Sequence, residues 1–550
     1  MDGEQADQAS GSATETVAYD AIPRGRGMLL WQGKQLPGPA TVPDVRLTEI
    51  FDPRSELPLA QLDIEQHTPQ SPDSFLDQAV PNCLYYGDNR ETLAYLLANG
   101  WRGLVRMVYI DPPFGTGVDY VRKVRLRGAN NRVIGQSAEY RDAWVGDSYL
   151  QFMYERLFLL RELLAEDGSI WLHCDYRQNH RLRLLLEEVF GEENYLNTIS
   201  WRSQVARGAK VNAFYFPFST QYIEIFAKNR QAPTLWNPQK KRLTFSRDEA
   251  AAQFMEDERG FFRTSDPGTY SFERLKQLHQ RGRLYAPYGG EIVIDEENRR
   301  VFASKGGNIG VKYYLTRIRR DRYAVERGVD NLWDDVPGLG VTPGEDIGYP
   351  TQKTEALLAR AIAASTRPGD MVLDCFAGSG TTAAVAHKMG RRWIGCDISY
   401  GAIQATRRRL QRVVQEVGPG FAVYRVNETD AGLHSPQAEV TVRRSDEVAG
   451  QIEIDVLDYR PAAETLAAIA PGEQLAEAGN GDWRRWIEAI DVDTAYDGQV
   501  FRGLYADLPR RRRDMVEGSY IIGGAPDEGI TVAVRITDVL GDECLVMRRV

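Results

Sequence analysis

Two stretches of this 550-residue chain alternate apolar, strand-like runs with segments of helical period, and this alternation constrains the fold more than any other feature. In the first stretch, CLYY, LVRMVYI and SIWLHC are each followed by a turn and, further on, by a helix-like segment. In the second, MVLDCF and RWIGCD are followed in the same way. Strands that alternate with helices form a mostly parallel sheet with helices on both faces. We therefore predict an α/β fold in which both stretches share one sheet.

Charge and period divide the chain further. Residues 201–330 carry 24 Lys and Arg against 15 Asp and Glu, whereas residues 431–550 carry 13 against 22 and contain period-two segments such as QIEIDVLDY. The N-terminal residues are polar and rich in Pro and Gly, which indicates a disordered or extended lead-in. The predicted parts are the lead-in 1–80, a first α/β part 81–200, a basic insert 201–345, a second α/β part 346–415 and an acidic, β-rich domain 431–550.

Composition excludes several classes of protein. The five cysteines are widely spaced and form no CxxC or Cys/His pattern, so we expect neither disulfides nor a bound metal. No apolar run reaches about 18 residues and the polar N-terminus resembles no secretory signal, so we expect a cytoplasmic protein without a membrane span. The net charge of −10 argues against a surface covered in basic charge, although this average hides the basic insert.

A glycine-rich turn follows a buried strand in VLDCFAGSGTT. Gly378 and Gly380 allow a tight turn close to a ligand, and Thr381-Thr382 open a helix with free N–H groups. Asp397 ends the next strand about twenty residues downstream, where an acidic side chain reaches ribose hydroxyls in nucleotide sites. A nucleoside cofactor without a polyphosphate, such as S-adenosylmethionine, is one interpretation. A dinucleotide is less favoured, and a purely structural turn stays open.

The segment Asp111-Pro112-Pro113-Phe114 follows the strand-like run VRMVYI. The prolines alone can be a strand terminator, because Pro–Pro cannot continue a ladder of hydrogen bonds. The carboxylate and the aromatic ring beside them suit a different task, the methylation of an exocyclic amine. Asp111 and the Pro112 carbonyl can accept the two amine protons and free the nitrogen lone pair, while Phe114 can stack on the base. This mechanism needs no metal.

Together, these motifs resemble the signature of amino-group DNA methyltransferases of the beta class, in which Asp-Pro-Pro-Phe precedes Phe-x-Gly-x-Gly. The order, with a variable insert between the motifs, is similar to that of the modification subunits of type III restriction systems and their solitary relatives. The resemblance covers most of residues 83–412 through YYGDN, YIDPPFGTG, GYPTQKTEALLARAIAAS, LDCFAGSGTTAA and GCDIS. Two positions depart from the family pattern: Gly115 stands where Asn is usual, and Thr354 where Pro is usual.

The resemblance implies a Rossmann-like, S-adenosylmethionine-dependent methyltransferase fold with an inserted target-recognition region and a small β-rich C-terminal domain. Residues 81–200 and 346–415 are then the two parts of the catalytic domain, and 201–345 is the DNA-binding insert. The implied catalytic residues are Asp111, Pro112, Pro113 and Phe114. The implied cofactor-binding residues are Asp88, Asn89, Gln352, Lys353, Asp374, Phe376, Gly378, Gly380, Thr381, Thr382 and Asp397.

The implied reaction is methyl transfer to the N6 amino group of adenine in double-stranded DNA, because adenine-specific relatives usually carry Asp at the position of Asp111. The implied setting is a restriction or phage-defence system, with restriction, helicase or other defence subunits as partners and homodimers as a common state. A cytosine-N4 or RNA-directed methyltransferase stays open. So does a catalytically silent DNA-binding or assembly subunit that keeps the fold.

Three further features have both a structural and a functional interpretation. His173 has no second ligand at metal spacing, which favours a structural histidine. The arginine runs 407–412 and 510–513 are typical of solvated surface, with a DNA or partner contact open for the second, although the acidic charge of its domain favours protein partners over DNA. One aromatic group can hold an extruded base, but such clusters are more often core: Trp201, Phe214, Tyr215, Phe216 and Phe218.

Overall fold

The chain forms two compact units. The computed structural model describes residues 16–17, 28–38, 40–53, 82–128, 133–142, 146–205, 214–232, 234–342, 344–427, 436–445, 448, 450–469, 481–523 and 529–550. The first unit contains the residues up to Asn237 together with Asn331–Val550, and the second is Pro238–Asp330. All the motifs of the sequence analysis with a proposed chemical role lie in the first unit.

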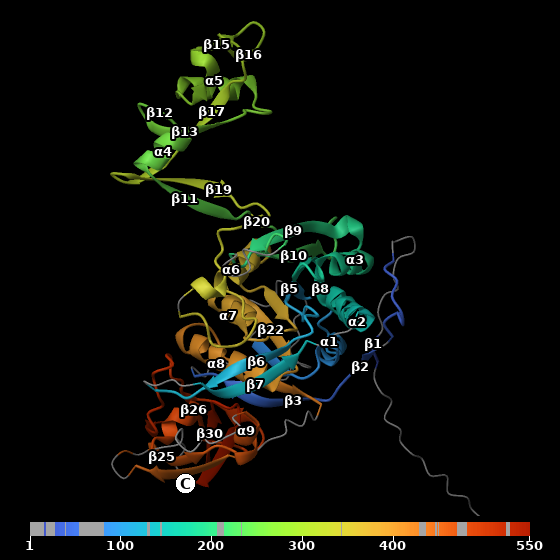
Figure 1. The fold of residues 1–550 in the computed structure, drawn as a ribbon, viewed down its shortest axis with the longest axis vertical. Coiled ribbons are helices and arrows are strands. Elements are labelled where there is room, and N and C mark those ends of the chain that lie inside the picture. The colour runs from blue at the N-terminus through green and yellow to red at the C-terminus, as the bar shows by residue number, and fades with distance from the viewer. Residues whose placement is uncertain are drawn as a thin grey trace, which may run out of the picture. The chain divides into compact units, whose positions relative to one another are not determined.

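A large mixed sheet organises the first unit (Figure 1). At its centre, neighbouring parallel strands follow the order β8 (Leu164–Cys174), β5 (Val105–Ile110), β21 (Met371–Asp374), β22 (Arg392–Asp397), β4 (Asn82–Tyr86) and β23 (Phe421–Val426). One edge continues through β10 (Thr220–Ala227), β9 (Tyr195–Arg202) and β20 (Leu332–Trp333), and the other through β3 (Val45–Phe51) and β27 (Phe501–Arg502). Because β21 lies between β5 and β22, the two stretches of sequence interleave in one sheet, as predicted.

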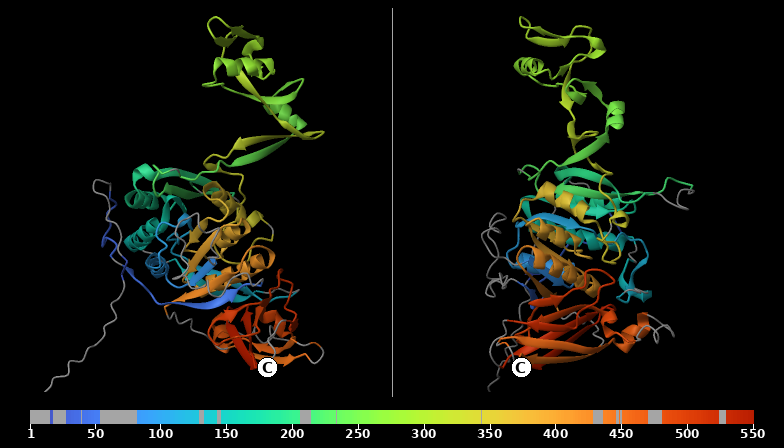
Figure 2. Two further views of the ribbon diagram at one scale, coloured as in Figure 1. Left: turned by 180° about the vertical axis from the view of Figure 1, so that it is seen from behind. Right: turned by 90° about the vertical axis from the view of Figure 1, so that its left-hand side faces the viewer.

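Helices cover both faces of this sheet (Figures 1 and 2). On one face lie α1 (Asn89–Ala98), α2 (Asp147–Leu163) and α3 (Asn179–Phe190), and on the other α6 (Glu355–Ser365), α7 (Thr381–Lys388) and α8 (Tyr400–Glu416). Strands β4 and β5 are buried along their whole length, which explains their continuous apolar sequence. This is the Rossmann-like α/β fold expected from the sequence. Among the described helices, none has the length and hydropathy of a membrane span.

The expectation of a disordered or extended lead-in over 1–80 is wrong for part of its described residues. β3 pairs antiparallel with β23 and so adds a strand to the large sheet. Further upstream, Lys34 Nζ lies 2.6 Å from a Glu188 carboxylate oxygen and over the ring of Trp31. Two short strands, β1 (Thr16–Val17) and β2 (Ala40–Thr41), also pair. Charged residues in VRLTEIF obscure the strand in the sequence; one of them, Glu49, pairs with the buried Arg407. Residues 1–15, 18–27, 39 and 54–80 lie outside the described ranges.

The predicted insert 201–345 is too wide at both ends. Trp201 lies in β9, and β10 fills the sheet position between β8 and β9, so this segment belongs to the first unit. At the other end, β20 pairs with β9. The compact second unit is Pro238–Asp330. The sequence does not mark these limits, because the place of β10 is set by its antiparallel pairing with β8 and β9.

The second unit, Pro238–Asp330, consists of short elements around two small apolar clusters. One cluster includes Phe261 and Tyr323, and the other includes Leu278 and Val311. The helices are α4 (Arg247–Gln253) and α5 (Phe272–Gln280). The sheets are β11 (Lys240–Ser246) with β19 (Arg322–Gly328) and β18 (Thr316–Arg319); β12 (Met255–Asp257) with β13 (Gly260–Ser265), β17 (Gly310–Tyr314) and β14 (Leu284–Tyr285); and β15 (Ile292–Asp295) with β16 (Arg300–Ala303).

The acidic C-terminal residues form two small sheets and a helix, α9 (Ala463–Ile469). Their core also receives Val124 and Leu126, from and just after β6 (Asp119–Arg125), which forms a hairpin with β7 (Val133–Arg141). Since β27 joins the large sheet beside β3, the predicted domain 431–550 is not fully separate. The sheets are β24 (Gln437–Arg444), β25 (Ile452–Arg460) and β29 (Ser519–Ile522); and β28 (Tyr505–Asp507), β26 (Ile487–Asp493), β30 (Thr531–Asp538) and β31 (Glu543–Arg549).

Candidate active site

The carboxyl ends of five neighbouring strands carry acidic side chains. In sheet order these are Asp175 after β8, Asp111 after β5, Asp374 at the end of β21, Asp397 at the end of β22, and Asp88 beyond β4. In open α/β sheets, ligands bind at this edge. The motifs that the sequence separates by long distances therefore meet in one place.

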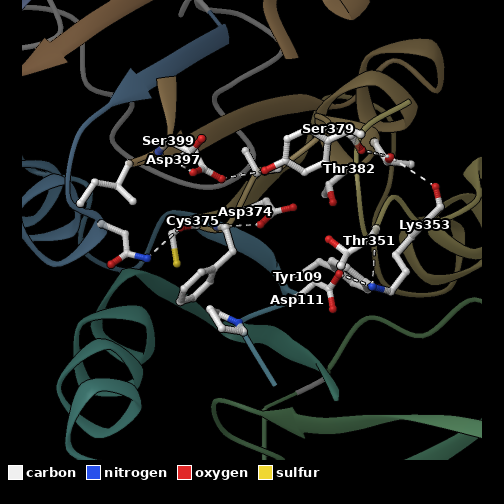
Figure 3. Close-up of a pocket in the computed structure, with 18 of the residues that line it drawn as sticks. Tyr109, Asp111, Thr351, Lys353, Asp374, Cys375, Ser379, Thr382, Asp397 and Ser399 are labelled. Atoms are coloured by element: carbon white, nitrogen blue, oxygen red, sulfur yellow. Dashed lines mark hydrogen bonds and ion pairs between the residues drawn. The ribbon is translucent and has the colours of Figure 1, made fainter. Parts of the chain in front are cut away.

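A cavity of about 400 Å³ lies at this edge (Figure 3). We name it the first cavity; it is lined by Asp111, Pro113 and all the cofactor-binding residues expected from the sequence except Gly380. Four aspartates line it, whereas Arg156 and Lys353 are its basic residues. Cavities of this size hold small-molecule ligands. The excess of carboxylates favours a ligand that carries positive charge.

The glycine turn forms one wall of the first cavity. Gly378 has a φ of +51°, and its N–H donates to an Asp397 carboxylate oxygen at 2.8 Å. Gly380 has a φ of +69° just before α7, and a Cβ there would lie 2.7 Å from side-chain atoms of Thr406. The Thr406 hydroxyl in turn donates to the Gly378 carbonyl at 3.0 Å. Both glycines are therefore required by the backbone, and Gly380 shapes the cavity without lining it.

Asp374 is a buried carboxyl in the wall of the first cavity. One of its oxygens accepts a hydrogen bond from the Phe376 N–H at 3.0 Å, and Thr382 also hydrogen-bonds to it. Burial raises the pKa of Asp374 to about 7, and the negative charges of Asp111 and Asp397 act in the same direction. A positively charged ligand group would favour the ionised form.

Asp111 holds one engaged and one unused carboxylate oxygen. Lys353 forms an ion pair with Oδ2, and its Nζ also donates to the Thr351 carbonyl at 3.2 Å (Figure 3). The other oxygen, Oδ1, is buried and has no hydrogen-bond partner among the described residues. Because an unpaired buried acceptor costs free energy, Oδ1 is poised to accept an N–H from a ligand. Lys353 thus contacts the expected catalytic carboxylate as well as lining the first cavity.

A second cavity, of about 600 Å³, adjoins the first, since Thr351, Gln352 and Lys353 line both. Phe114 lies in its wall together with Tyr176 and Phe218. The rings of Tyr176 and Phe218 stack with their centroids 3.6 Å apart and an angle of 3° between their planes. Such a surface suits a planar, aromatic ligand.

The expectation that the neighbouring aromatic residues are core is wrong for most of them. Trp201 is buried, but Phe214, Tyr215, Phe216 and Phe218 are all exposed. They lie between β9 and β10, and Tyr215 and Phe218 line the second cavity. Exposed aromatic residues beside a cavity indicate a binding surface rather than a core.

Asp88 and Asn89 line the first cavity, but their side chains already have protein partners. Asp88 caps α1 and pairs with Arg156 at 3.0 Å. Asn89 accepts a hydrogen bond from Arg156 and donates to the Cys375 carbonyl at 2.9 Å. These bonds connect α1 and α2 to the end of β21. Sequence reasoning missed Arg156; its only signal was a basic residue within the apolar pattern of α2.

Asp142 fixes the loop that follows Phe114, and no motif in the sequence marked it. Its carboxylate accepts hydrogen bonds from the N–H groups of Gly115 and Thr116, both at 2.9 Å. The φ of Gly115 is +64°, a left-handed conformation that Asn also tolerates, which is consistent with the Asn usual in the family. Gln178 Nε2 donates to the Phe114 carbonyl at 3.1 Å. Two buried polar side chains therefore hold the loop in place.

The remaining predicted residues divide between the two cavities. Pro113 lines the first and Phe114 the second, whereas Pro112 is buried and lines neither. Gln352 lines both, and its amide is bonded to backbone groups of the preceding loop. Thr354 is the N-cap of α6; its side chain makes no capping bond with the helix, and its hydroxyl donates to the Pro337 carbonyl at 3.1 Å.

His173 fits the structural interpretation given to it. Its Nδ1 lies 2.7 Å from the Tyr109 hydroxyl, and its Nε2 lies 2.8 Å from Gln221 Oε1. Burial lowers the pKa of His173 to about 4, so the ring is neutral at pH 7. Within the described ranges, no group of three His, Cys, Asp or Glu side chains is arranged to hold a metal ion.

A family model described as DNA methylase matches residues 105–408, more than half of the chain. The chain belongs to the DNA methylase family. The match begins at β5, just before Asp111, and ends in α8, beyond the glycine turn, so it contains both of these motifs; Asp88 and Asn89, which also line the first cavity, lie before it. This methylase is therefore an enzyme that methylates DNA.

The methylase is similar to the type II methyltransferase M.EcaI of Enterobacter cloacae, with 27% identity over 60% of this chain and 70% of that protein. It is also similar to the type III restriction-modification enzyme StyLTI Mod subunit of Salmonella typhimurium strain LT2, with 27% identity over 55% of this chain and 49% of that protein. A shorter region, 14% of this chain, is 51% identical to 27% of the DNA adenine methyltransferase YhdJ of Escherichia coli strain K12. The chain thus spans about half of the Mod subunit's length.

Proposed function

We propose that this methylase transfers a methyl group from S-adenosylmethionine to the N6 amino group of adenine in double-stranded DNA. The observation that carries the proposal is the buried, unpartnered Oδ1 of Asp111 in the first cavity, beside a lysine that lines both cavities. The Asp at this position and the similarity to a protein named as a DNA adenine methyltransferase support adenine over cytosine.

The residues of the first cavity fit S-adenosylmethionine, which supplies an activated methyl group on a positively charged sulfonium. The buried carboxyl of Asp374 and the acidic lining favour that positive charge. Asp397 ends β22, the strand next to the glycine turn, and at this position a carboxylate accepts hydrogen bonds from ribose hydroxyls. Phe376 and Phe152 pack edge to face with centroids 6.0 Å apart and provide an apolar wall for a planar base.

Asp111 acts on the amine in this proposal. Its Oδ1 accepts one N–H of the exocyclic amine and the Pro112 carbonyl accepts the other, which frees the nitrogen lone pair. Lys353 holds Oδ2, so the carboxylate is fixed with its second oxygen available. Alignment of two reacting groups of this kind contributes about 7–11 kcal/mol to lowering the barrier.

The target adenine has to leave the duplex, because its amine is out of reach of the cofactor within the base stack. We propose that the second cavity receives it. The stacked rings of Tyr176 and Phe218 offer a planar surface, and stacking on an aromatic side chain is worth about 1–3 kcal/mol per base. Lys and Arg residues of the second unit, Pro238–Asp330, neutralise DNA phosphates and contribute to target recognition in this proposal.

We also propose that the enzyme is the modification component of a restriction or phage-defence system. The similarity to the StyLTI Mod subunit supports this setting, in which restriction subunits are partners and the methylase dimerises. Single-molecule sequencing of DNA from cells with and without the gene tests it. A methylated motif that depends on the gene, and resistance of the methylated DNA to cleavage by a co-expressed nuclease partner, are the expected results.

The substitution Asp111→Ala tests the proposed reaction. Without the acceptor, the turnover of labelled S-adenosylmethionine with duplex DNA should fall at least about a hundredfold. Cofactor affinity, measured by calorimetry, should change little, because the turn and the other three aspartates remain. Mass spectrometry of the digested product should give N6-methyladenine. N4-methylcytosine as the product, or near-normal turnover of the variant, would contradict the proposal.

A further inference from the structure

A strongly basic cavity lies where α8, the loop Gly344–Tyr349 and the C-terminal residues meet. We name it the basic cavity; its volume is about 160 Å³. Nine of its lining residues are Lys or Arg, and two are acidic. Tyr349 lines both this cavity and the first cavity. The basic residues come from both arginine runs of the sequence and from the β6 segment, which no assigned role has used.

The two acidic lining residues do not neutralise this charge, although Arg409 and Arg510 also pair with acids outside the lining, Glu355 at 2.9 Å and Glu416 at 3.0 Å. Glu488 Oε2 lies 2.5 Å from an Arg127 nitrogen and 3.7 Å from an Arg408 nitrogen, so one carboxylate serves two guanidinium groups. Although burial opposes it, the positive charges of Arg127 and Arg408 lower the pKa of Glu488 to about 2. Burial also lowers the pKa of Arg408 to about 10, with the charges of Arg122, Arg127 and Arg412 acting in the same direction.

Guanidinium groups that line the cavity have N–H groups available to donate hydrogen bonds to a ligand. Arg412 uses one nitrogen to donate to the Pro509 carbonyl at 2.8 Å, while its Nε is buried without a partner in the described part of the chain. Arg408 lies no closer than 3.7 Å to its acid. Guanidinium groups bind phosphate oxygens with paired, charge-assisted hydrogen bonds. Since about 10–15 Å³ of such space holds one water, the cavity has room for a phosphate group.

The rim of the basic cavity favours a phosphate that belongs to a long polyanion. Arg510 and Arg512 line the cavity and are exposed, as are their neighbours in the run 510–513, and Lys123 is exposed on the β6 side. The loop that leads from Gly344 to Lys353 borders all three cavities in turn. DNA held at the basic cavity would therefore lie beside the place where the target base enters.

We propose that the basic cavity binds a phosphate of the DNA backbone and so gives the C-terminal residues a direct part in DNA binding. Arg408 and Arg412 contact the phosphate, and Arg510 and Arg512 contact its neighbours along the strand. Arg409 connects this site to the cofactor, because it lines the basic cavity and donates to Thr381 Oγ1 at 2.8 Å. The inference rests on DNA as the substrate in the proposed function, but not on Asp111 or on the methylated base.

The test measures duplex binding by fluorescence anisotropy at a series of salt concentrations, for the full chain and for Arg408→Gln/Arg412→Gln. Each lost phosphate contact lowers the slope of log Kd against log salt by about one. Loss of two contacts should lower the ratio of Kd at 200 mM to Kd at 50 mM salt by about tenfold, equally for specific and non-specific duplexes. Arg443→Gln/Arg460→Gln, two exposed arginines in ion pairs elsewhere in the C-terminal residues, is the matched control and should keep the wild-type slope.

A slope that equals the wild-type slope in the first variant overturns the proposal. If that variant does not fold, the exposed pair Arg510→Gln/Arg512→Gln gives the same readout with the same expectation. A parallel titration with inorganic phosphate separates the two sources of the anion. Phosphate binding that is lost in Arg408→Gln/Arg412→Gln while the DNA slope stays unchanged assigns the cavity to a free anion and overturns the DNA assignment. Turnover of Asp111→Ala tests the proposed reaction separately, because that variant keeps every arginine.

Discussion

We expect the buried carboxyl of Asp374 to make cofactor affinity depend on pH. Its pKa in the folded protein, about 7, lies above its ordinary value of 3.8, so the stability that this carboxyl contributes falls as pH rises from about 4 to about 7. A cationic ligand binds the ionised carboxylate more tightly than the protonated form, so its affinity rises with pH. At pH 6 only about a tenth of the carboxyl is ionised, so affinity for S-adenosylmethionine should rise about tenfold between pH 6 and pH 8.

Calorimetry with the cofactor over this pH range checks the prediction. Asp374→Asn should bind weakly with no such pH dependence. The matched control is Asp538→Asn in the C-terminal residues, where burial also raises the pKa to about 7 and the carboxylate bonds to the Tyr459 hydroxyl at 2.8 Å. That variant should keep the pH dependence of cofactor affinity. A wild-type affinity that is flat from pH 6 to pH 8 would show that the cofactor's charge does not reach Asp374.

We infer that Asp142 is a positioning residue for the loop that follows Phe114. The Asp142 carboxylate accepts hydrogen bonds from two backbone N–H groups. Asn at this position would replace one of the two acceptor oxygens by an NH₂ donor. Two donors would then face each other, so the loop after Phe114 should shift. A displacement of about 1 Å at reacting groups costs on the order of a hundredfold in rate. We expect Asp142→Asn to lower kcat by about tenfold to a hundredfold and to leave the cofactor's Kd unchanged.

Steady-state kinetics with a duplex substrate measures this effect. Asp147→Asn, a change of the same kind in the exposed first turn of α2, is the control and should keep the wild-type kcat. An equal loss of cofactor affinity and turnover in Asp142→Asn would instead indicate general unfolding of the site.

The sequence indicated the residues that line the first cavity better than the residues that hold them in place. Asp111, Asp374 and Asp397 lie in motifs whose spacing has meaning without a structure. Arg156 and Asp142 lie in segments where nothing distinguishes them from surface charges, because their partners are distant in the chain. The ion pair between Lys353 and Asp111 was equally hidden, since it joins motifs on two different parts of the sheet.

At the level of elements, the start of α7 depends on Gly380. Alanine there must adopt a φ of +69° and place its Cβ 2.7 Å from Thr406. A left-handed conformation for a residue other than Gly costs about 1–3 kcal/mol, and the clash adds to this by displacing the turn. We expect Gly380→Ala to lower both the free energy of unfolding and the affinity for the cofactor.

Urea unfolding and cofactor titration measure the two effects. Gly103→Ala is the matched control, because Gly103 has a φ of +74° but its Cβ would meet nothing within 4 Å. That variant should show only the conformational cost, with unchanged cofactor affinity. If Gly380→Ala lowers the free energy of unfolding no more than Gly103→Ala does, the close approach of Thr406 to residue 380 does not contribute to the need for glycine there.

Elements with a regular pattern were predicted correctly, and elements defined by pairing were not. The central strands are apolar along their length and read as strands from sequence alone. β3 became visible only in the structure because its partner β23 is far away in the chain, and β10 because its place is set by pairing with β8 and β9. The limits of the insert were wrong for the same reason.

At the scale of the whole molecule, buried ion pairs join the N-terminal strand β3, the helix α8 and the C-terminal residues. Glu49 of β3 lies 3.1 Å from Arg407 of α8 and 2.7 Å from Arg535 of β30. Both arginines are buried, and each has one further acidic partner, Glu543 and Asp491 respectively. The three segments therefore share one set of charges inside the first unit.

Glu49→Gln should consequently destabilise all three segments together. Removing one partner from a buried ion pair costs about 3–5 kcal/mol, because the remaining charges stay buried. Scanning calorimetry should show a lower unfolding temperature for one transition that contains both the large sheet and the C-terminal sheets. Asp458→Asn, which breaks an exposed pair with Arg460, should change stability by less than about 1 kcal/mol. Separate transitions for the two regions, or a Glu49→Gln protein as stable as the wild type, would mean that the C-terminal residues fold independently of the catalytic sheet.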